Sequence, residues 1–208
     1  MVGCSGDSSG DTDLMTALDP QAVAAALAAK PVSLDDALEL EDAGGLPSTP
    51  GFYAWWIEEG TIGGVPHHSH PLVSELGLLY VGISPKRPGS SGLIRSRVID
   101  QHIRGNTSSS TFRFVLASLL LDELKLTPRA TVKKIVLGRD DNGRLRQWQF
   151  DHLSLTWCKR ERPWEVEDAV IALMQPPLNS AANETHPFYP RVNSARAAFR
   201  AAGRAQRP

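Results

Sequence analysis

Cysteine, long apolar runs and leader-like segments are all scarce or missing in this chain of 208 residues. Its two cysteines, Cys4 and Cys158, are too few for a disulfide framework or a zinc site. No apolar run approaches the length of a bilayer span, and the N-terminus lacks the basic start and apolar stretch of a secretory signal. We therefore expect a soluble, cytoplasmic protein without a membrane partner, built on a single core.

Positive charges are scarce in the N-terminal part of the chain, and negative charges are missing from its C-terminal end. Residues 1–45 contain a single base, Lys30, against nine acids, which gives this segment a charge of -8. The net charge of the whole chain is -1, so the remaining residues are near +7, and five arginines but no acid follow residue 190. A basic body favours a polyanionic partner such as DNA, because each neutralised phosphate releases counterions; a solvated basic face is the alternative.

A further basic stretch lies between residues 86 and 113, where six bases accompany one acid, Asp100. Arg97 shares a polar helical face with Gln101. We predict nucleic-acid contacts for the other five bases, which are Lys86, Arg87, Arg95, Arg104 and Arg113.

The N-terminal part of the chain predicts an extension to the main domain. Residues 1–13 are rich in Gly, Ser and Asp and have too little apolar surface to fold, so we expect a disordered acidic tail. Two helices over 20–30 and 33–42, the second capped by Ser33, then form a helical extension over 14–48.

Apolar patterning predicts strands and helices over the rest of the chain. The strands are short aromatic and β-branched runs at 51–57, 78–83 and 153–158. The helices cover 91–103, 111–123, 142–152 and 163–174, with Ser91, Ser110 and Pro163 at the starts of the first, second and fourth. We predict an α/β or α+β fold, a small sheet covered by helices, as one domain over 49–190 followed by a basic tail over 191–208.

Phosphodiester hydrolysis needs an activated water, charge stabilisation at the phosphate and neutralisation of the departing oxygen. A carboxylate-held divalent cation, an arginine and phenolic hydroxyls can supply these functions. The chain offers such groups in the order Tyr53, Tyr80, Arg97 and Glu167. Each of them taken singly is as easily an ordinary strand or helix residue, so their joint order carries the interpretation.

The phrases GFY at 51–53 and YVG at 80–82 resemble the two half-motifs of the GIY-YIG nucleases. Arg97 on the next helix resembles the family's arginine, and Glu167, twelve residues before Asn179, resembles the carboxylate of its late helix. The resemblance covers roughly residues 49–187. It implies a small, mainly antiparallel sheet flanked by helices and a metal-dependent DNA endonuclease that uses Mg²⁺, with Mn²⁺ as a substitute and no small-molecule cofactor.

The same resemblance implies a role for each matching residue. Tyr53 would be a general base or a hydroxyl that positions water, and Tyr80 would hold the nucleophile or the scissile phosphate. Arg97 would clamp the phosphate, Glu167 would bind the metal, and Asn179 would support the site. Phenols ionise near pH 10, so Tyr53 is a weak base unless a cation favours its phenolate.

Several alternatives stay open at this point. His102 follows Arg97 by five residues, about 140° away on an ideal helix, so it is either a group behind the site or, as we slightly favour, a surface histidine. Glu165 competes with Glu167 for the carboxylate role. The inserted loop between the half-motifs contains histidines at 67, 68 and 70, which suggest either a metal site or a plain polar loop.

Two alternative functions also follow from the sequence. The first is a catalytically weak or inactive nucleic-acid-binding module with the same fold, whose DNA binding depends on salt but not on Glu167. The second is an interaction protein whose acidic N-terminal helices bind a basic partner. Separately, the charge split suggests that the acidic segment folds over the basic groove of the same chain and inhibits it.

Overall fold

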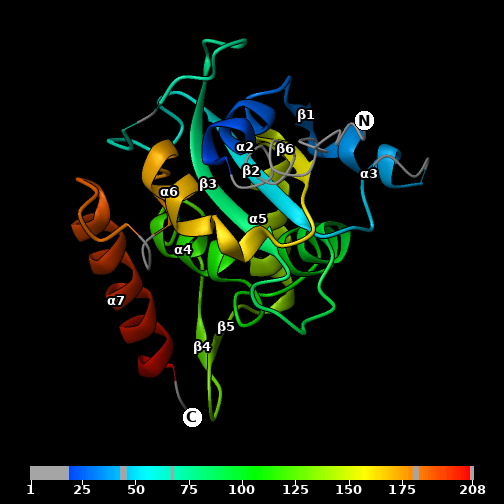
Figure 1. Cartoon of the computed structure of the whole chain (residues 1–208). Helices are drawn as coiled ribbons and strands as arrows, with labels where there is room; N and C mark the ends of the chain where they lie inside the picture. Colours follow the sequence, from blue (N-terminus) through cyan, green and yellow to red (C-terminus); the bar gives the residue numbers. More distant parts are fainter. Residues whose placement is uncertain (1–18, 43–45, 67, 180–182, 207–208) are drawn as a thin grey trace, which may run out of the picture.

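A four-stranded antiparallel sheet forms the centre of the computed structural model, which describes residues 19–42, 46–66, 68–179 and 183–206 (Figure 1). The strands lie in the order β1-β6-β2-β3, and every neighbouring pair is antiparallel. They are β1 (Val32–Ser33), β6 (Leu153–Lys159), β2 (Gly51–Glu58) and β3 (Leu76–Ser84). Helices flank this sheet, which confirms the predicted fold class.

The sheet separates two apolar clusters, because successive side chains of a strand point to opposite faces. On β2, Trp56 belongs to one cluster, whereas Tyr53 and Trp55 belong to the other. All three side chains are buried. A strand that is covered on both faces has no polar side, and this explains why residues 51–57 form a continuous apolar run.

Helices cover both faces of the sheet (Figure 1). The face of Trp56 carries α2 (Pro20–Leu27) and α6 (Glu167–Met174). The face of Tyr53 carries η1 (Ser96–Ile103), α4 (Thr111–Leu119) and α5 (Arg139–His152). Farther out, α7 (Tyr189–Ala205) packs against α4 and against a separate hairpin of β4 (Arg129–Ala130) and β5 (Ile135–Val136).

The N-terminal extension is built into this fold. Asp19 caps α2 by accepting the N–H of Gln21 at 2.9 Å. Ser33 caps α3 (Leu34–Asp42) by accepting the N–H of Asp36 at 3.0 Å, as predicted. Between the two helices β1 pairs with β6, so the described part of the acidic segment extends the sheet. The predicted disordered tail, residues 1–13, lies outside the described residues.

Other predicted helices differ in their bounds or geometry. The helix expected from Ser91 begins at Ile94 and continues as the π-helix η1. The helix expected over 163–174 is divided into a 3₁₀ turn, η2 (Pro163–Glu165), and α6. The division falls at Val166, whose φ of -128° is not helical and whose side chain is buried against the sheet.

Four elements were not predicted, which are strand β1, the two strands of the β4–β5 hairpin, and helix α7. The β4–β5 hairpin consists of two-residue strands, which are too short to show an alternating pattern. Helix α7 occupies most of the segment that was expected to be a basic tail. The domain boundaries stay predictions. None of the described helices is long and apolar enough to cross a membrane.

Candidate active site

Tyr53 and Tyr80 lie on the same face of neighbouring strands. The register of β2 and β3 pairs Tyr53 with Gly82 and Trp55 with Tyr80, so the two tyrosines are diagonal neighbours. A β-bulge at Leu79, which has no opposite residue in β2, interrupts this register. Because of the bulge, Leu79 and Tyr80 both face the cluster that contains Tyr53. The regular register from Gly82 to Tyr80 places Tyr80 on the side of Tyr53, and the bulge adds Leu79 to the same side.

Gly82 makes room for the ring of Tyr53. A Cβ atom at Gly82 would overlap the phenol oxygen and the adjacent ring atoms of Tyr53. Any side chain at this position would therefore displace the tyrosine or the strand. The glycine of the YVG phrase is required by the tyrosine of the GFY phrase, so the two halves of the motif fit each other sterically.

The Tyr53 hydroxyl begins a buried chain of hydrogen bonds. It lies 2.7 Å from Nε2 of His102, and Nδ1 of the same ring lies 2.6 Å from Oγ of Ser110. Ser110 Oγ also accepts the N–H of Arg113 at 3.0 Å, which confirms the predicted cap of α4. The side chains of Tyr53, His102 and Ser110 are all buried. The chain links the motif tyrosine to the start of α4.

His102 reaches Tyr53 because it lies on a π-helix. In η1 the N–H of Arg104 donates to the carbonyl of Ile99, five residues earlier, at 2.8 Å. Residues five apart diverge by about 140° on an α-helix, whereas π-helical bonding brings them to the same side. Arg97 and His102 therefore serve one site. The interpretation of His102 as a surface histidine is wrong, since its side chain is fully buried.

Arg97 brings a positive charge to the tyrosines. Its guanidinium donates to Oε1 of Gln101 and interacts with the hydroxyl of Tyr53. Its buried Nε has no hydrogen-bond partner among the described residues. A buried donor without a partner is costly in free energy, and an anionic oxygen bound at Arg97 would reduce that cost.

Glu167, the first residue of α6, joins these groups, and α6 packs against the edge strand β3. Partial burial raises the pKa of Glu167, and the charge of Lys86 opposes this rise. In turn, desolvation and the charge of Arg97 lower the pKa of Lys86. Glu167, Lys86 and Arg97 thus form one charged cluster. The competing carboxylate, Glu165, is exposed and forms an ion pair with Arg162 at 3.0 Å.

Burial fixes the protonation of the aromatic groups. It raises the pKa of Tyr80 to about 12, although the charge of Arg97 opposes the rise. Burial and the neighbouring Tyr80 raise the pKa of Tyr53 still further above its ordinary value. Burial and the charge of Arg97 lower the pKa of His102 well below its ordinary value. At neutral pH the site therefore holds two phenols and a neutral imidazole.

Two phenols, an arginine and a carboxylate thus converge within one part of the chain, and that part matches a known family. A family model described as the GIY-YIG catalytic domain matches residues 51–198. The chain belongs to the GIY-YIG family. This family is one of nucleases, so its domain acts on nucleic acids. A comparison with curated proteins and another with solved structures gave no match.

In this GIY-YIG domain Asn179 supports the edge strand. Its Oδ1 accepts the N–H of Val81 at 2.9 Å, and its Nδ2 donates to the carbonyl of Val81 at 2.6 Å. The N–H of Leu178 donates to the carbonyl of Leu79 at 3.1 Å. Both ends of the amide are engaged by the backbone next to Tyr80, so Asn179 is a positioning residue.

Arg113 is not a nucleic-acid contact of the GIY-YIG domain, and that prediction is wrong. Its side chain is fully buried. The guanidinium donates to the carbonyls of His102 and Ile103, both at 2.9 Å, and to Oδ1 of Asn142 at 2.7 Å. Arg113 therefore satisfies backbone carbonyls at the end of η1. The spacing of charges along the chain gives no sign of such burial.

The other predicted nucleic-acid contacts lie at the surface. Lys86, Arg87 and Arg104 are exposed, and Arg95 is partly exposed. Lys86 and Arg87 come from the segment after β3, whereas Arg95 and Arg104 flank η1. Their role in binding stays a prediction.

Sequence reasoning missed two groups that shape this GIY-YIG site. Ser110 was assigned only a capping role, yet it also bonds His102. The Phe112 ring lies 5.1 Å from the ring of Tyr80 and 5.5 Å from that of His102, between ring centres. Both residues come from the start of α4, and no local pattern shows that this start faces the motif strands.

The inserted loop of the domain does not supply a metal site at His70. Nε2 of His70 donates to the carbonyl of Ala29 at 2.9 Å, and Nδ1 accepts the N–H of Leu72 at 3.1 Å. Both ring nitrogens are engaged, so His70 fastens the loop to the end of α2. His67 lies outside the described residues, within which no group of three or more metal-binding side chains is found.

Proposed function

We propose that this chain is a Mg²⁺-dependent DNA endonuclease, with Mn²⁺ as a substitute, that hydrolyses a phosphodiester bond in one step. The observation that carries this proposal is the electrostatic coupling of Tyr53, Tyr80, Arg97 and Glu167 within a domain of the nuclease class. These are the groups that phosphodiester hydrolysis needs.

The donor set fits Mg²⁺ as the metal. Magnesium keeps several waters and is commonly bound through one or two carboxylates together with phosphates of the substrate. Glu167 offers one partly exposed carboxylate beside Lys86 and Arg97, where a phosphate would complete the ligand set. The metal would supply Lewis-acid stabilisation of the phosphate charge.

The chain's own groups bind and orient the phosphate. Arg97, with its unpartnered Nε, would hold the non-bridging oxygens, and Lys86 would add a second positive charge. Tyr80 stays a phenol at neutral pH because burial raises its pKa to about 12. Its O–H is therefore available to donate to the phosphate or to the attacking water.

Tyr53 and His102 together would accept the proton of the attacking water. Burial disfavours both a phenolate at Tyr53 and a protonated His102, so the Tyr53 proton would move to Nε2 of His102, 2.7 Å away, only in concert with proton uptake by Tyr53. The water proton would then pass to Tyr53 Oη as the Tyr53 proton moves to His102. Ser110, 2.6 Å from Nδ1, would hold the ring in the required tautomer.

Nicking of supercoiled plasmid by the purified protein tests this function, with Mg²⁺, Mn²⁺ or a chelator in parallel reactions. The proposal expects cutting with either metal and none with the chelator. DNA binding without cutting is the second candidate, which the complete burial of Tyr53 favours because water must reach its hydroxyl. Salt-sensitive binding with no cutting under any metal would select this second candidate.

A further inference from the structure

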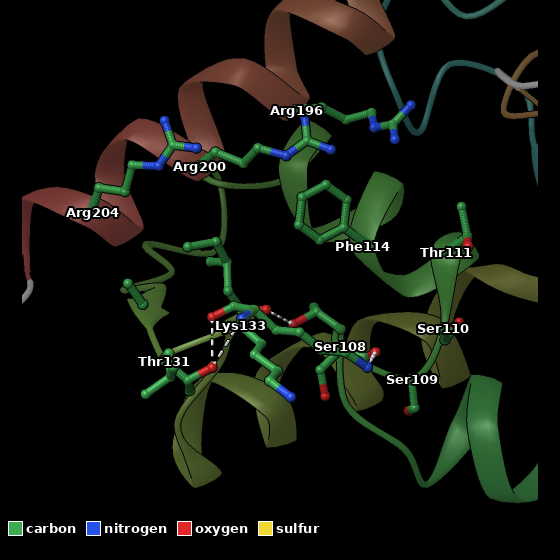
Figure 2. Close-up of a pocket in the computed structure, with 15 residues that line it drawn as sticks. Ser108, Ser109, Ser110, Thr111, Phe114, Thr131, Lys133, Arg196, Arg200 and Arg204 are labelled. Carbon is green, nitrogen blue, oxygen red and sulfur yellow. Dashed lines mark hydrogen bonds between the residues drawn. The ribbon is translucent and has the colours of Figure 1, made fainter.

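A basic pocket lies between α7 and the β4–β5 hairpin (Figure 2). Its volume is about 550 Å³, and no acidic residue lines it. The active-site groups Tyr53, Tyr80, Arg97 and Glu167 are not among its lining residues. The pocket contains five bases, which are Lys133, Lys134, Arg196, Arg200 and Arg204.

One wall of the pocket is an arginine stripe on α7. Arg196, Arg200 and Arg204 are spaced four residues apart, so they lie on one side of the helix. The Arg196 guanidinium carbon lies 5.9 Å from the centre of the Phe114 ring. The Arg200 guanidinium carbon lies 5.0 Å from the centre of the same ring. Like charges four apart repel each other, and an anion in the pocket would relieve this repulsion.

The facing wall is a hydroxyl-rich loop that leads into α4. Ser108, Ser109 and Ser110 line the pocket, followed by Thr111, the first residue of α4 (Figure 2). Lys134 fixes this loop by donating from Nζ to the carbonyl of Ser108 at 2.6 Å. A helix N-terminus next to hydroxyl groups and cations favours a bound phosphate.

The hairpin points to a duplex as the occupant. Its turn is closed by the N–H of Thr131, which donates to the carbonyl of Lys134 at 2.7 Å. The turn carries Val132, which is 90% exposed, next to the exposed Lys133. The major groove of DNA admits a two-stranded ribbon, and an apolar tip can contact a thymine methyl group there.

We infer that the pocket is a second DNA contact, in which Lys133, Arg200 and Arg204 bind backbone phosphates of the substrate duplex away from the scissile bond. The inference rests on the proposed function in taking DNA as the substrate. Ser110 lines the pocket and also bonds His102, so the two sites share one loop. A duplex held by this loop would be positioned relative to the catalytic groups.

A pair of charge-matched variants tests the inference. In the first, Lys133→Gln, Arg200→Gln and Arg204→Gln are combined. The control combines Lys30→Gln, Lys125→Gln and Arg139→Gln, which removes three positive charges from other exposed positions. Binding of a short fluorescent DNA duplex is measured by anisotropy over a range of salt concentrations, with a chelator present so that nothing is cut.

The slope of log affinity against log salt should become shallower by about 0.9 for each lost phosphate contact, or about 2.7 for the first variant. The control should keep the wild-type slope, and a third variant with Lys133→Arg, Arg200→Lys and Arg204→Lys should restore it. Equal slopes for the first variant and the wild type, or equal losses in the first variant and the control, would overturn the inference.

Cleavage assays on the same proteins separate this inference from the proposed function. If the protein never cuts DNA but its binding depends on the pocket residues, the pocket inference is supported and the proposed nuclease function is contradicted. If the first variant cuts DNA in the presence of metal and binds it as tightly as the wild type, the proposed nuclease function is supported and the pocket inference is contradicted. Matching melting temperatures for all variants show that the fold is intact.

Discussion

The hydroxyl of Tyr53 and Nε2 of His102 lie 2.7 Å apart in the buried core. This contact joins the first half-motif on β2 to the π-helix η1, which also carries Arg97. Both side chains are buried, so loss of either one would leave the facing polar atom of the other without this hydrogen bond. The pair therefore combines a structural role with the proposed proton transfer.

Replacing Tyr53 with Phe should abolish most of the cleavage while leaving the fold in place. The change keeps the ring above Gly82 but removes the proton relay, so the single-turnover rate should fall by on the order of 10²–10⁴. The free energy of unfolding should drop by about 1–3 kcal/mol, because Nε2 of His102 loses its partner. Tyr189→Phe, which alters the remaining tyrosine on α7, is the control. Wild-type cutting by the Tyr53 variant would contradict the relay.

The stability of the protein should fall as the pH decreases below about 6.5. His102 has a lowered pKa in the folded chain, so in this range the unfolded chain binds its proton first. Each such group contributes a slope of at most about 1.4 kcal/mol per pH unit. His186, whose pKa is also lowered by burial, acts in the same direction.

Urea denaturation from about pH 5 to about pH 8, a range of about three units around the ordinary pKa of histidine, measures this dependence. His102→Gln should make the dependence on pH shallower, whereas Asn193→Ala, at an exposed position of α7 without a titratable group, should leave it unchanged. If the His102 variant kept the full wild-type dependence of stability on pH, the lowered pKa of His102 would not be the cause of that dependence.

Gly82→Ala should disturb the site from the opposite strand. The added methyl overlaps the Tyr53 phenol, and overpacking of this kind commonly costs about 1–3 kcal/mol. We expect a lower melting temperature together with a loss of cleavage. Gly63→Ala is the matched control, because a Cβ atom there meets nothing within 4 Å. Unchanged stability and cleavage in the Gly82 variant would contradict the steric fit of the two half-motifs.

Asn179→Ala should loosen the edge strand beside Tyr80. Two hydrogen bonds to Val81 are lost, each worth about 1 kcal/mol, so unfolding should become easier by about 2 kcal/mol. Hydrogen exchange at the Val81 amide should accelerate more than exchange elsewhere in β3. Asn193→Ala, at an exposed position of α7, should change neither quantity.

The sheet and the order of the motif residues were predictable because their signals are local. Runs of buried aromatic and β-branched residues predicted β2, β3 and β6, and the half-motifs on β2 and β3 placed Tyr53 and Tyr80 correctly on the central strands. The caps Ser33 and Ser110 were predictable for the same reason, since a cap acts within three residues of its helix start.

The rest of the site depends on tertiary packing, which the sequence pattern does not contain. An α-helical period assigned His102 to the surface, whereas the π-helical bonds of η1 turn it into the core. Arg113 was grouped with the surface bases although neighbouring carbonyls bury it. Likewise, Lys133 meets the arginines of α7 only because the hairpin and the helix pack together.

The most direct test of the account compares Glu167→Gln with Glu165→Gln in Mg²⁺-dependent nicking of supercoiled plasmid. Both changes remove one carboxylate from neighbouring positions, but only Glu167 lies with Lys86 and Arg97. The account predicts that the Glu167 variant loses nicking while the Glu165 variant cuts like the wild type. Equal nicking by the two variants, or a loss confined to the Glu165 variant, would contradict it.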